Sequence, residues 1–269
     1  MFSNNLLNLK TKGSKKLFTS YIVALEYSLE ESLAQMHSLA KYCDIIEIGM
    51  PFANPIADGI VIQGASNRSL ANNKTNLSHV FELVKAFRKT NATTSVVLMG
   101  YYNTVYKFGE DRFVSLAKQN GVDGIILCDL PIYENKAFYL KCKQNDICFI
   151  QLVTNLTTYD RMVEISDYSS GFIYFVSLLG STGSKEPDIS LIAPNVKMAK
   201  EVFKNLPILL GFGIKSKAVA NLAYSIADGI IIGSHIIETY NRAKSLHQDS
   251  TLTLQHFEAE IKEYKYHSI

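Results

Sequence analysis

Residues 45–59 read Ile-Ile-Glu-Ile-Gly-Met-Pro-Phe-Ala-Asn-Pro-Ile-Ala-Asp-Gly, and this stretch decides the fold class. Its first five residues are almost wholly apolar, which is typical of a parallel strand covered by helices on both faces. The residues that follow are rich in proline, asparagine, aspartate and glycine, which predicts a loop directly after the strand. A buried strand that ends in such a loop is the repeating half of a β/α unit.

The same pattern recurs along the whole chain. Eight apolar runs predict strands at 17–25, 45–49, 95–100, 124–127, 147–153, 172–176, 207–211 and 229–232. Helical spacing of apolar residues between the strands predicts helices at 28–42, 77–89, 111–120, 134–145, 159–166, 188–205, 216–225 and 251–264. The alternation predicts an α/β fold, a (β/α)8 TIM barrel with an extra N-terminal helix; an open doubly wound sheet is the alternative.

Composition narrows the class of protein. The 269 residues are 47% hydrophobic and carry a net charge of +2, which favours one barrel domain over 1–269 and no nucleic-acid partner. No apolar run is long enough to cross a membrane, and the polar first sixteen residues do not resemble a signal peptide. We therefore expect a cytoplasmic protein whose four cysteines are unpaired thiols.

Two carboxylates stand where a barrel builds its active site, at the carboxyl ends of the strands. Glu47 lies within an apolar strand, where burial would raise its pKa and suit it to acid–base work. Asp58 lies eleven residues later on the loop, which can fold back over the barrel mouth. The pair predicts a site in which one group moves protons and the other orients the substrate or stabilises charge.

Glycine-rich loops follow the last three strands, at 180–183, 211–213 and 233–234. Such loops let backbone N–H groups approach an anion, and barrels commonly bind phosphate after their last two strands. The six histidines lack metal-ligand spacing, and no predicted strand contains a lysine that would form a Schiff base. These observations favour acid–base chemistry on a phosphorylated small molecule, without a metal.

Residues 47–63, Glu-Ile-Gly-Met-Pro-Phe-Ala-Asn-Pro-Ile-Ala-Asp-Gly-Ile-Val-Ile-Gln, resemble the signature segment of tryptophan synthase α subunits. Supporting similarities lie at 98–103, 129–131, 180–183, 211–214 and 233–234, so the resemblance spans about 17–240. It implies a lyase that cleaves indole-3-glycerol phosphate to indole and glyceraldehyde 3-phosphate in tryptophan biosynthesis.

The resemblance also implies roles for individual residues. Glu47 matches the catalytic acid–base group, and Asp58 matches the carboxylate that pairs with the indole N–H. The implied substrate contacts are Tyr21, Tyr101, Ile126, Tyr174, Thr182 and Phe212, and the implied phosphate ligands are Gly183, Gly213, Gly233 and Ser234. The implied partner is a β subunit in an α2β2 tetramer, contacted by Asn54, Asn103, Asp129 and Pro131, and pyridoxal phosphate is expected only on that partner.

The sequence departs from the family pattern around the site. Residues 23–27, Ala53-Asn54, Ile60, Thr104 and 178–179 replace residues that the family usually holds there. These changes bear on coupling to a partner more than on the carboxylates. They leave open a weakly active subunit that mainly activates the β subunit, and the glycine loops alone would also permit another phosphate-binding isomerase.

Overall fold

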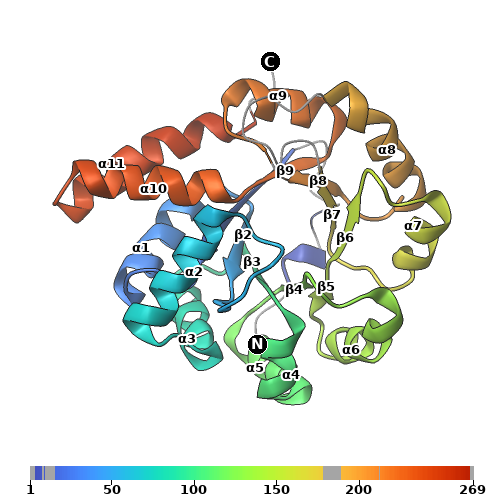
Figure 1. The fold of residues 1–269 in the computed structure, drawn as a ribbon, viewed down its shortest axis with the longest axis horizontal. Helices are drawn as coiled ribbons and strands as arrows, with labels where there is room; N and C mark the ends of the chain where they lie inside the picture. The colour runs from blue at the N-terminus through green and yellow to red at the C-terminus, as the bar shows by residue number, and fades with distance from the viewer. Residues whose placement is uncertain (1–3, 8, 10–15, 178–188, 212, 267–269) are drawn as a thin grey trace.

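The strands of the computed structural model form a closed parallel barrel (Figure 1). The structure describes residues 4–7, 9, 16–177, 189–211 and 213–266. In these residues the strands are β1 (Leu17–Val23), β2 (Ile45–Gly49), β3 (Ser95–Gly100), β4 (Gly124–Leu127), β5 (Cys148–Phe149), β6 (Gln151–Thr154), β7 (Ile173–Val176), β8 (Ile208–Gly211) and β9 (Gly229–Ile232).

The two ends of the sheet are halves of one predicted strand. The order is β5-β4-β3-β2-β1-β9-β8-β7-β6, and only Ile150 separates β5 from β6. The Ile150 amide donates to the carbonyl of Ile125 at 3.0 Å, so pairing with β4 continues through the break. All eight predicted strands are therefore confirmed, and the barrel is confirmed over the open sheet.

Helices surround the barrel, as the ribbon in Figure 1 shows. The eight predicted helices correspond to α1 (Leu29–Ala40), α3 (Leu77–Arg88), α5 (Glu110–Asn120), α6 (Ile132–Gln144), α7 (Tyr159–Ser166), α8 (Ile189–Val202), α9 (Lys217–Ile226) and α11 (Ser250–Ile261). The sequence did not predict α2 (Ile60–Asn73), α4 (Tyr102–Phe108) or α10 (Ser234–Leu246), and the helix predicted at 251–264 ends in the short 3-10 helix η2 (Lys262–Tyr264). At the N-terminal end, the described part of the chain places a 3-10 turn at Leu6 and Leu7, where an extra helix was expected.

Successive residues of each strand point alternately into the barrel and outward toward the helices. One buried cluster lies inside the barrel and includes Ile45, Val97 and Ile126. A larger cluster joins the outward residues of the strands, such as Ile46 and Ile48, to the helices. Both faces of the sheet are thus buried, which explains the continuous apolar runs. All four cysteines are free, and Cys43, Cys142 and Cys148 are buried, which confirms the expected thiols.

Aspartates pin neighbouring strands together at the amino-terminal end of the barrel. Each stands immediately before a strand and accepts the backbone N–H of the neighbouring strand through its carboxylate. The pairs are Asp44 with Phe18, Asp123 with Val96, and Asp228 with Ile208, at 2.8–3.0 Å. Asp123 also forms a buried ion pair with Arg88 at 2.6 Å. These contacts stabilise the end of the barrel opposite the candidate site.

Among the described residues, no helix is both long and apolar enough to cross a bilayer.

Candidate active site

Glu47 is the most unusual side chain inside the barrel. It lies on β2 between Tyr21 of β1 and Val97 of β3, and none of its surface is exposed. Neither carboxylate oxygen has a hydrogen-bond partner among the described residues. Burial raises the pKa of Glu47 from 4.5 to about 8, because the charged form loses its hydration without compensation. The side chain is therefore mostly protonated at neutral pH.

Two tyrosine rings lie over glycines near this carboxyl group. A Cβ atom at Gly49 would stand 2.0 Å from the hydroxyl oxygen of Tyr21, and one at Gly211 would stand 2.6 Å from that of Tyr174. Both rings occupy space that any larger strand residue would take. Burial raises the pKa of each phenol well above 10, and the nearby carboxylates add to the rise, so both hydroxyls stay neutral.

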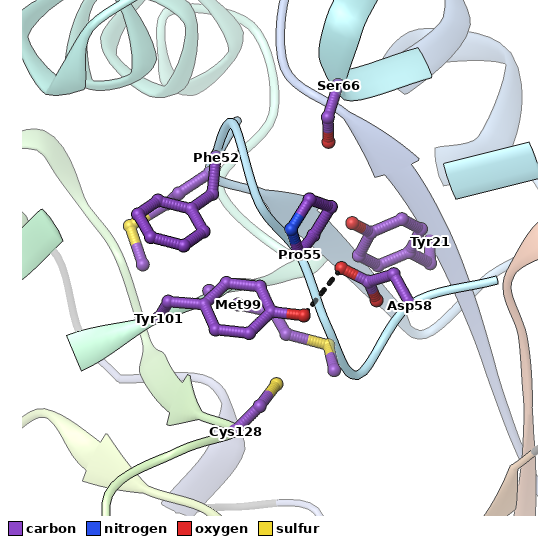
Figure 2. A pocket seen from close by; sticks show the side chains of 10 residues that line it. Tyr21, Phe52, Pro55, Asp58, Ser66, Met99, Tyr101 and Cys128 are labelled. Atoms are coloured by element: carbon purple, nitrogen blue, oxygen red, sulfur yellow. Dashed lines mark hydrogen bonds between the residues drawn. The ribbon is translucent and has the colours of Figure 1, made fainter. Parts of the chain in front are cut away.

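Asp58 lies at the barrel mouth on the loop between β2 and α2. The hydroxyl of Tyr101, which follows β3, donates to Asp58 Oδ2 at 3.0 Å and accepts from the backbone amide of Ala57 at 3.0 Å (Figure 2). The side chain of Gln63 donates to the backbone carbonyl of Asp58 at 2.8 Å. Burial raises the pKa of Asp58, and the Tyr101 hydrogen bond opposes part of that rise. The loop thus returns over the barrel, as the sequence predicted.

Asp58 and Tyr101 border a small pocket that is lined by both apolar and polar side chains. The ring of Phe52 stacks on that of Tyr101, with centroids 4.9 Å apart and an interplanar angle of 21°. Figure 2 shows the side chains gathered around the space, with the thiol of Cys128 among them. The lining residues are Tyr21, Met50, Phe52, Pro55, Asp58, Ser66, Met99, Gly100, Tyr101 and Cys128. The lining thus combines aromatic and apolar side chains with the carboxylate of Asp58.

The other predicted substrate contacts either lie deeper in the barrel than the pocket or belong to residues that the structure does not describe. Ile126 and Tyr174 are buried in the cluster inside the barrel and are not among the residues that line the pocket. Thr182, Gly183 and Phe212 lie outside the described residues. Sequence reasoning missed Phe52 and Cys128, although each directly follows a predicted strand or stands in the loop after one.

Three of the four predicted phosphate ligands, Gly213, Gly233 and Ser234, follow two neighbouring strands. β8 pairs with β9, so Gly213 and Gly233 follow adjacent strands. Gly213 is exposed and has a φ of +78°, a conformation that favours glycine. Ser234 opens α10, and no side chain in the described part of the chain caps that helix at Gly233. The positive end of α10 is therefore available to an anion.

The four predicted partner contacts follow three successive strands on the same face as the pocket. All four are exposed: Asn54, Asn103, Asp129 and Pro131. Large apolar side chains are exposed beside them, with Ile56, Tyr106 and Tyr133 at 88%, 67% and 66% exposure. This apolar surface was not predicted. Within the described ranges, no group of three or more His, Cys, Asp or Glu side chains could hold a metal ion.

The fold and these side chains define the class of protein first: an α/β-barrel enzyme whose site combines a buried carboxyl group with a second carboxylate at the mouth. Comparison with known proteins then identifies the family. The family profile for the tryptophan synthase alpha chain matches residues 7–266. The chain therefore belongs to the tryptophan synthase alpha chain family, and it is a lyase of tryptophan biosynthesis.

Individual relatives agree with this assignment. The tryptophan synthase alpha chain of Pelagibacter ubique is 42% identical over 232 residues, 86% of each chain, and that of Cupriavidus metallidurans is 38% identical over 250 residues, 93% of each. The alpha subunit structure from Legionella pneumophila matches with a TM-score of 0.86 at 33% identity, covering 97% of this chain and 95% of that one. A structure describing mutual activation of the α2β2 complex of Pyrococcus furiosus matches with a TM-score of 0.83 at 30% identity, covering 93% and 98%.

Proposed function

We propose that this chain cleaves indole-3-glycerol phosphate to indole and glyceraldehyde 3-phosphate by a retro-aldol reaction, with Glu47 as the acid–base group. The observation that carries the proposal is a fully buried carboxyl group with no hydrogen-bond partner among the described residues and a pKa of about 8. Such a group holds a proton at neutral pH and can release it without first breaking a hydrogen bond.

The proton balance of the reaction suits one such group. Protonated Glu47 delivers its proton to C3 of the indole ring, which leaves a positive charge on the ring nitrogen. The Glu47 carboxylate then accepts the proton of the glycerol hydroxyl next to the ring while the carbon–carbon bond breaks. The bonding electrons return to the ring, the hydroxyl oxygen becomes the aldehyde oxygen, and Glu47 regains its proton.

Asp58 is assigned to the ring nitrogen. In the proposed complex its carboxylate accepts the indole N–H and stabilises the positive charge that develops there. Tyr101 holds Asp58 Oδ2 at 3.0 Å, which orients the carboxylate toward the pocket. The phosphate group is assigned to Gly213, Gly233 and Ser234 at the start of α10, where the helix supplies backbone N–H groups and its positive end.

Indole release from indole-3-glycerol phosphate tests the chemistry. Glu47→Gln and Asp58→Asn keep the shape of each side chain and remove its acid–base or charge-stabilising function, so both variants should release indole at least a hundredfold more slowly, on the order expected for loss of such a group. Asp160→Asn is the matched control, because it makes the same change at an exposed aspartate of α7 outside the pocket. A Glu47→Gln variant as active as the wild type would refute the assignment.

We also propose that the apolar surface around Ile56, Tyr106 and Tyr133 docks a tryptophan synthase β subunit in an α2β2 assembly. An exposed apolar patch beside an active site suits a partner that receives the indole product. Ile56→Ser should weaken co-elution with a purified β subunit, whereas Leu252→Ser should not, because that exposed leucine belongs to α11, which packs on α10 and α1 at the side of the barrel (Figure 1). The activity of the β subunit should also be measured with the Glu47→Gln variant. If this variant still stimulates the β subunit, the stimulation does not require catalysis by this chain.

The 269 residues are proposed to fold as one domain, because the barrel closes between segments from both halves of the chain. A single urea transition should then be seen by both circular dichroism and tyrosine fluorescence, which is usable because the chain has no tryptophan. Two separate transitions would contradict a single domain.

A further inference from the structure

One hydroxyl near the C-terminal end of the chain contacts both segments assigned to the phosphate group. Tyr264, the last residue of η2, places its hydroxyl 2.7 Å from Nε2 of His235 and 3.3 Å from the backbone carbonyl oxygen of Lys215. His235 directly follows Ser234 in the first turn of α10. Lys215 stands two residues after Gly213 in the loop between β8 and α9.

Hydrogen-bond chemistry sets the direction of these two contacts. A tyrosine hydroxyl has one proton, and the Lys215 carbonyl oxygen can only accept, so the hydroxyl donates to Lys215. In the His235 tautomer that carries its proton on Nε2, the same oxygen accepts from His235. The resulting chain runs from the His235 ring through the Tyr264 hydroxyl to the carbonyl of Lys215. It therefore joins the start of α10 to the loop after β8 through directed bonds.

Tyr264 is itself held firmly. Only 7% of its surface is exposed, and its backbone carbonyl accepts a 3.0 Å hydrogen bond from the hydroxyl of Tyr224 on α9. Its ring packs at 6.4 Å from that of Phe18 on β1 and meets the His235 ring edge-on at 5.6 Å. The hydroxyl is thus a fixed point set by β1 and α9, and the loop and the helix start are tied to it.

We propose that Tyr264 is a positioning residue for the phosphate group of the substrate: through His235 and Lys215 it fixes the spacing between Gly213 and Ser234. The inference rests on the proposed function for the location of the phosphate. It assigns a role in binding to the segment after α11, which touches neither Glu47 nor Asp58. Loss of the hydroxyl frees two backbone segments to separate, so it weakens phosphate binding and leaves proton transfer intact.

Tyr264→Phe tests the proposal, because it removes the hydroxyl and keeps the ring. The expected result is a rise in KM for indole-3-glycerol phosphate of about threefold to tenfold, the size of one net hydrogen bond, with kcat changed by less than about twofold. Tyr266→Phe is the matched control: it makes the same change two residues away, at a ring that packs on Tyr224. An unchanged KM in Tyr264→Phe would overturn the proposal, and so would an equal rise in Tyr266→Phe.

A double-mutant cycle separates positioning from general stability. His235→Phe keeps an aromatic ring against Tyr264 and removes Nε2. If both residues act through one chain of hydrogen bonds, the double variant should raise KM no more than the larger of the two single effects. Multiplying effects would mean that the residues act independently, which overturns the coupled chain.

Measuring the binding of a phosphate compound directly, without the reaction, separates the test of the positioning role from the test of the proposed function. Binding of sn-glycerol 3-phosphate, followed by calorimetry, should weaken in Tyr264→Phe by the same factor as KM rises and stay unchanged in Tyr266→Phe. If the wild type binds this probe but releases no indole, the proposed function fails while the positioning role is still measured. If indole release is normal and Tyr264→Phe binds the probe as the wild type does, only the positioning role fails.

Discussion

Replacing Glu47 by glutamine is expected to stabilise the protein against unfolding, and the gain should grow with pH. In the folded protein the pKa of Glu47 is about 8, whereas the unfolded chain has the ordinary value of 4.5. Between these values the folded state binds the proton more tightly than the unfolded state does. The free energy of unfolding therefore falls as pH rises through this window, and it is highest below 4.5, where both states are protonated.

The size of the effect follows from the pKa difference. Each pKa unit corresponds to about 1.4 kcal/mol, so the window from 4.5 to about 8 is worth on the order of 5 kcal/mol in all. At pH 7 the wild type has lost about 3 kcal/mol of this amount. A glutamine at this position cannot ionise and avoids the loss. Its buried amide has its own cost of about 1–3 kcal/mol, but that cost does not depend on pH.

The pH slope is therefore the decisive measurement. Urea unfolding followed by circular dichroism, at several pH values between about 5 and 8, gives the free energy of unfolding of both proteins. Their difference should move in favour of Glu47→Gln by roughly 1.4 kcal/mol for each pH unit. Asp58→Asn is the control, because Asp58 is partly exposed and hydrogen-bonded and should give a shallower slope. A difference that stays constant across the window would refute the burial of an unpaired carboxyl group at Glu47.

Three further outcomes are expected from other parts of the molecule. Asp123→Ala removes one partner of the buried ion pair at the amino-terminal end of the barrel and should lower the free energy of unfolding by about 3–5 kcal/mol in urea titrations; a loss below about 1 kcal/mol would contradict the pairing. Tyr101→Phe removes the donor to Asp58, so the pKa of Asp58 should rise further and the acid limb of the kcat/KM profile should move to higher pH; an unmoved limb would count against that role. Gly49→Ala puts a methyl group 2.0 Å from the Tyr21 hydroxyl oxygen and should cost about 1–3 kcal/mol of stability, and an unaffected urea midpoint would show that the ring does not lie there.

The strands were predictable because burial on both faces of the sheet produces a recognisable local sequence pattern. A parallel strand inside a ring of helices has no solvent-facing side, so its residues form a continuous apolar run that can be read without the fold. Each of the eight runs lies at an observed strand position, and the run at 147–153 spans both β5 and β6. The helices that were not predicted lack a comparable sequence pattern. Of α2 only Ala65, Ser66 and Ser69 are buried, so it shows no apolar stripe, and α4 is only seven residues long.

The sequence by itself determined the barrel, the segment that carries Glu47 and Asp58, and the family resemblance, because each is written in residues close together in the chain. The sequence predicted that burial raises the pKa of Glu47, but only the tertiary structure decided the size of that rise, since it depends on described neighbours from other strands that exclude water and offer no hydrogen bond. The contact of Tyr264 with His235 and Lys215 likewise joins segments 29 and 49 residues apart. Long-range contacts of this kind follow from how the closed barrel brings strand ends together, and no local pattern encodes them.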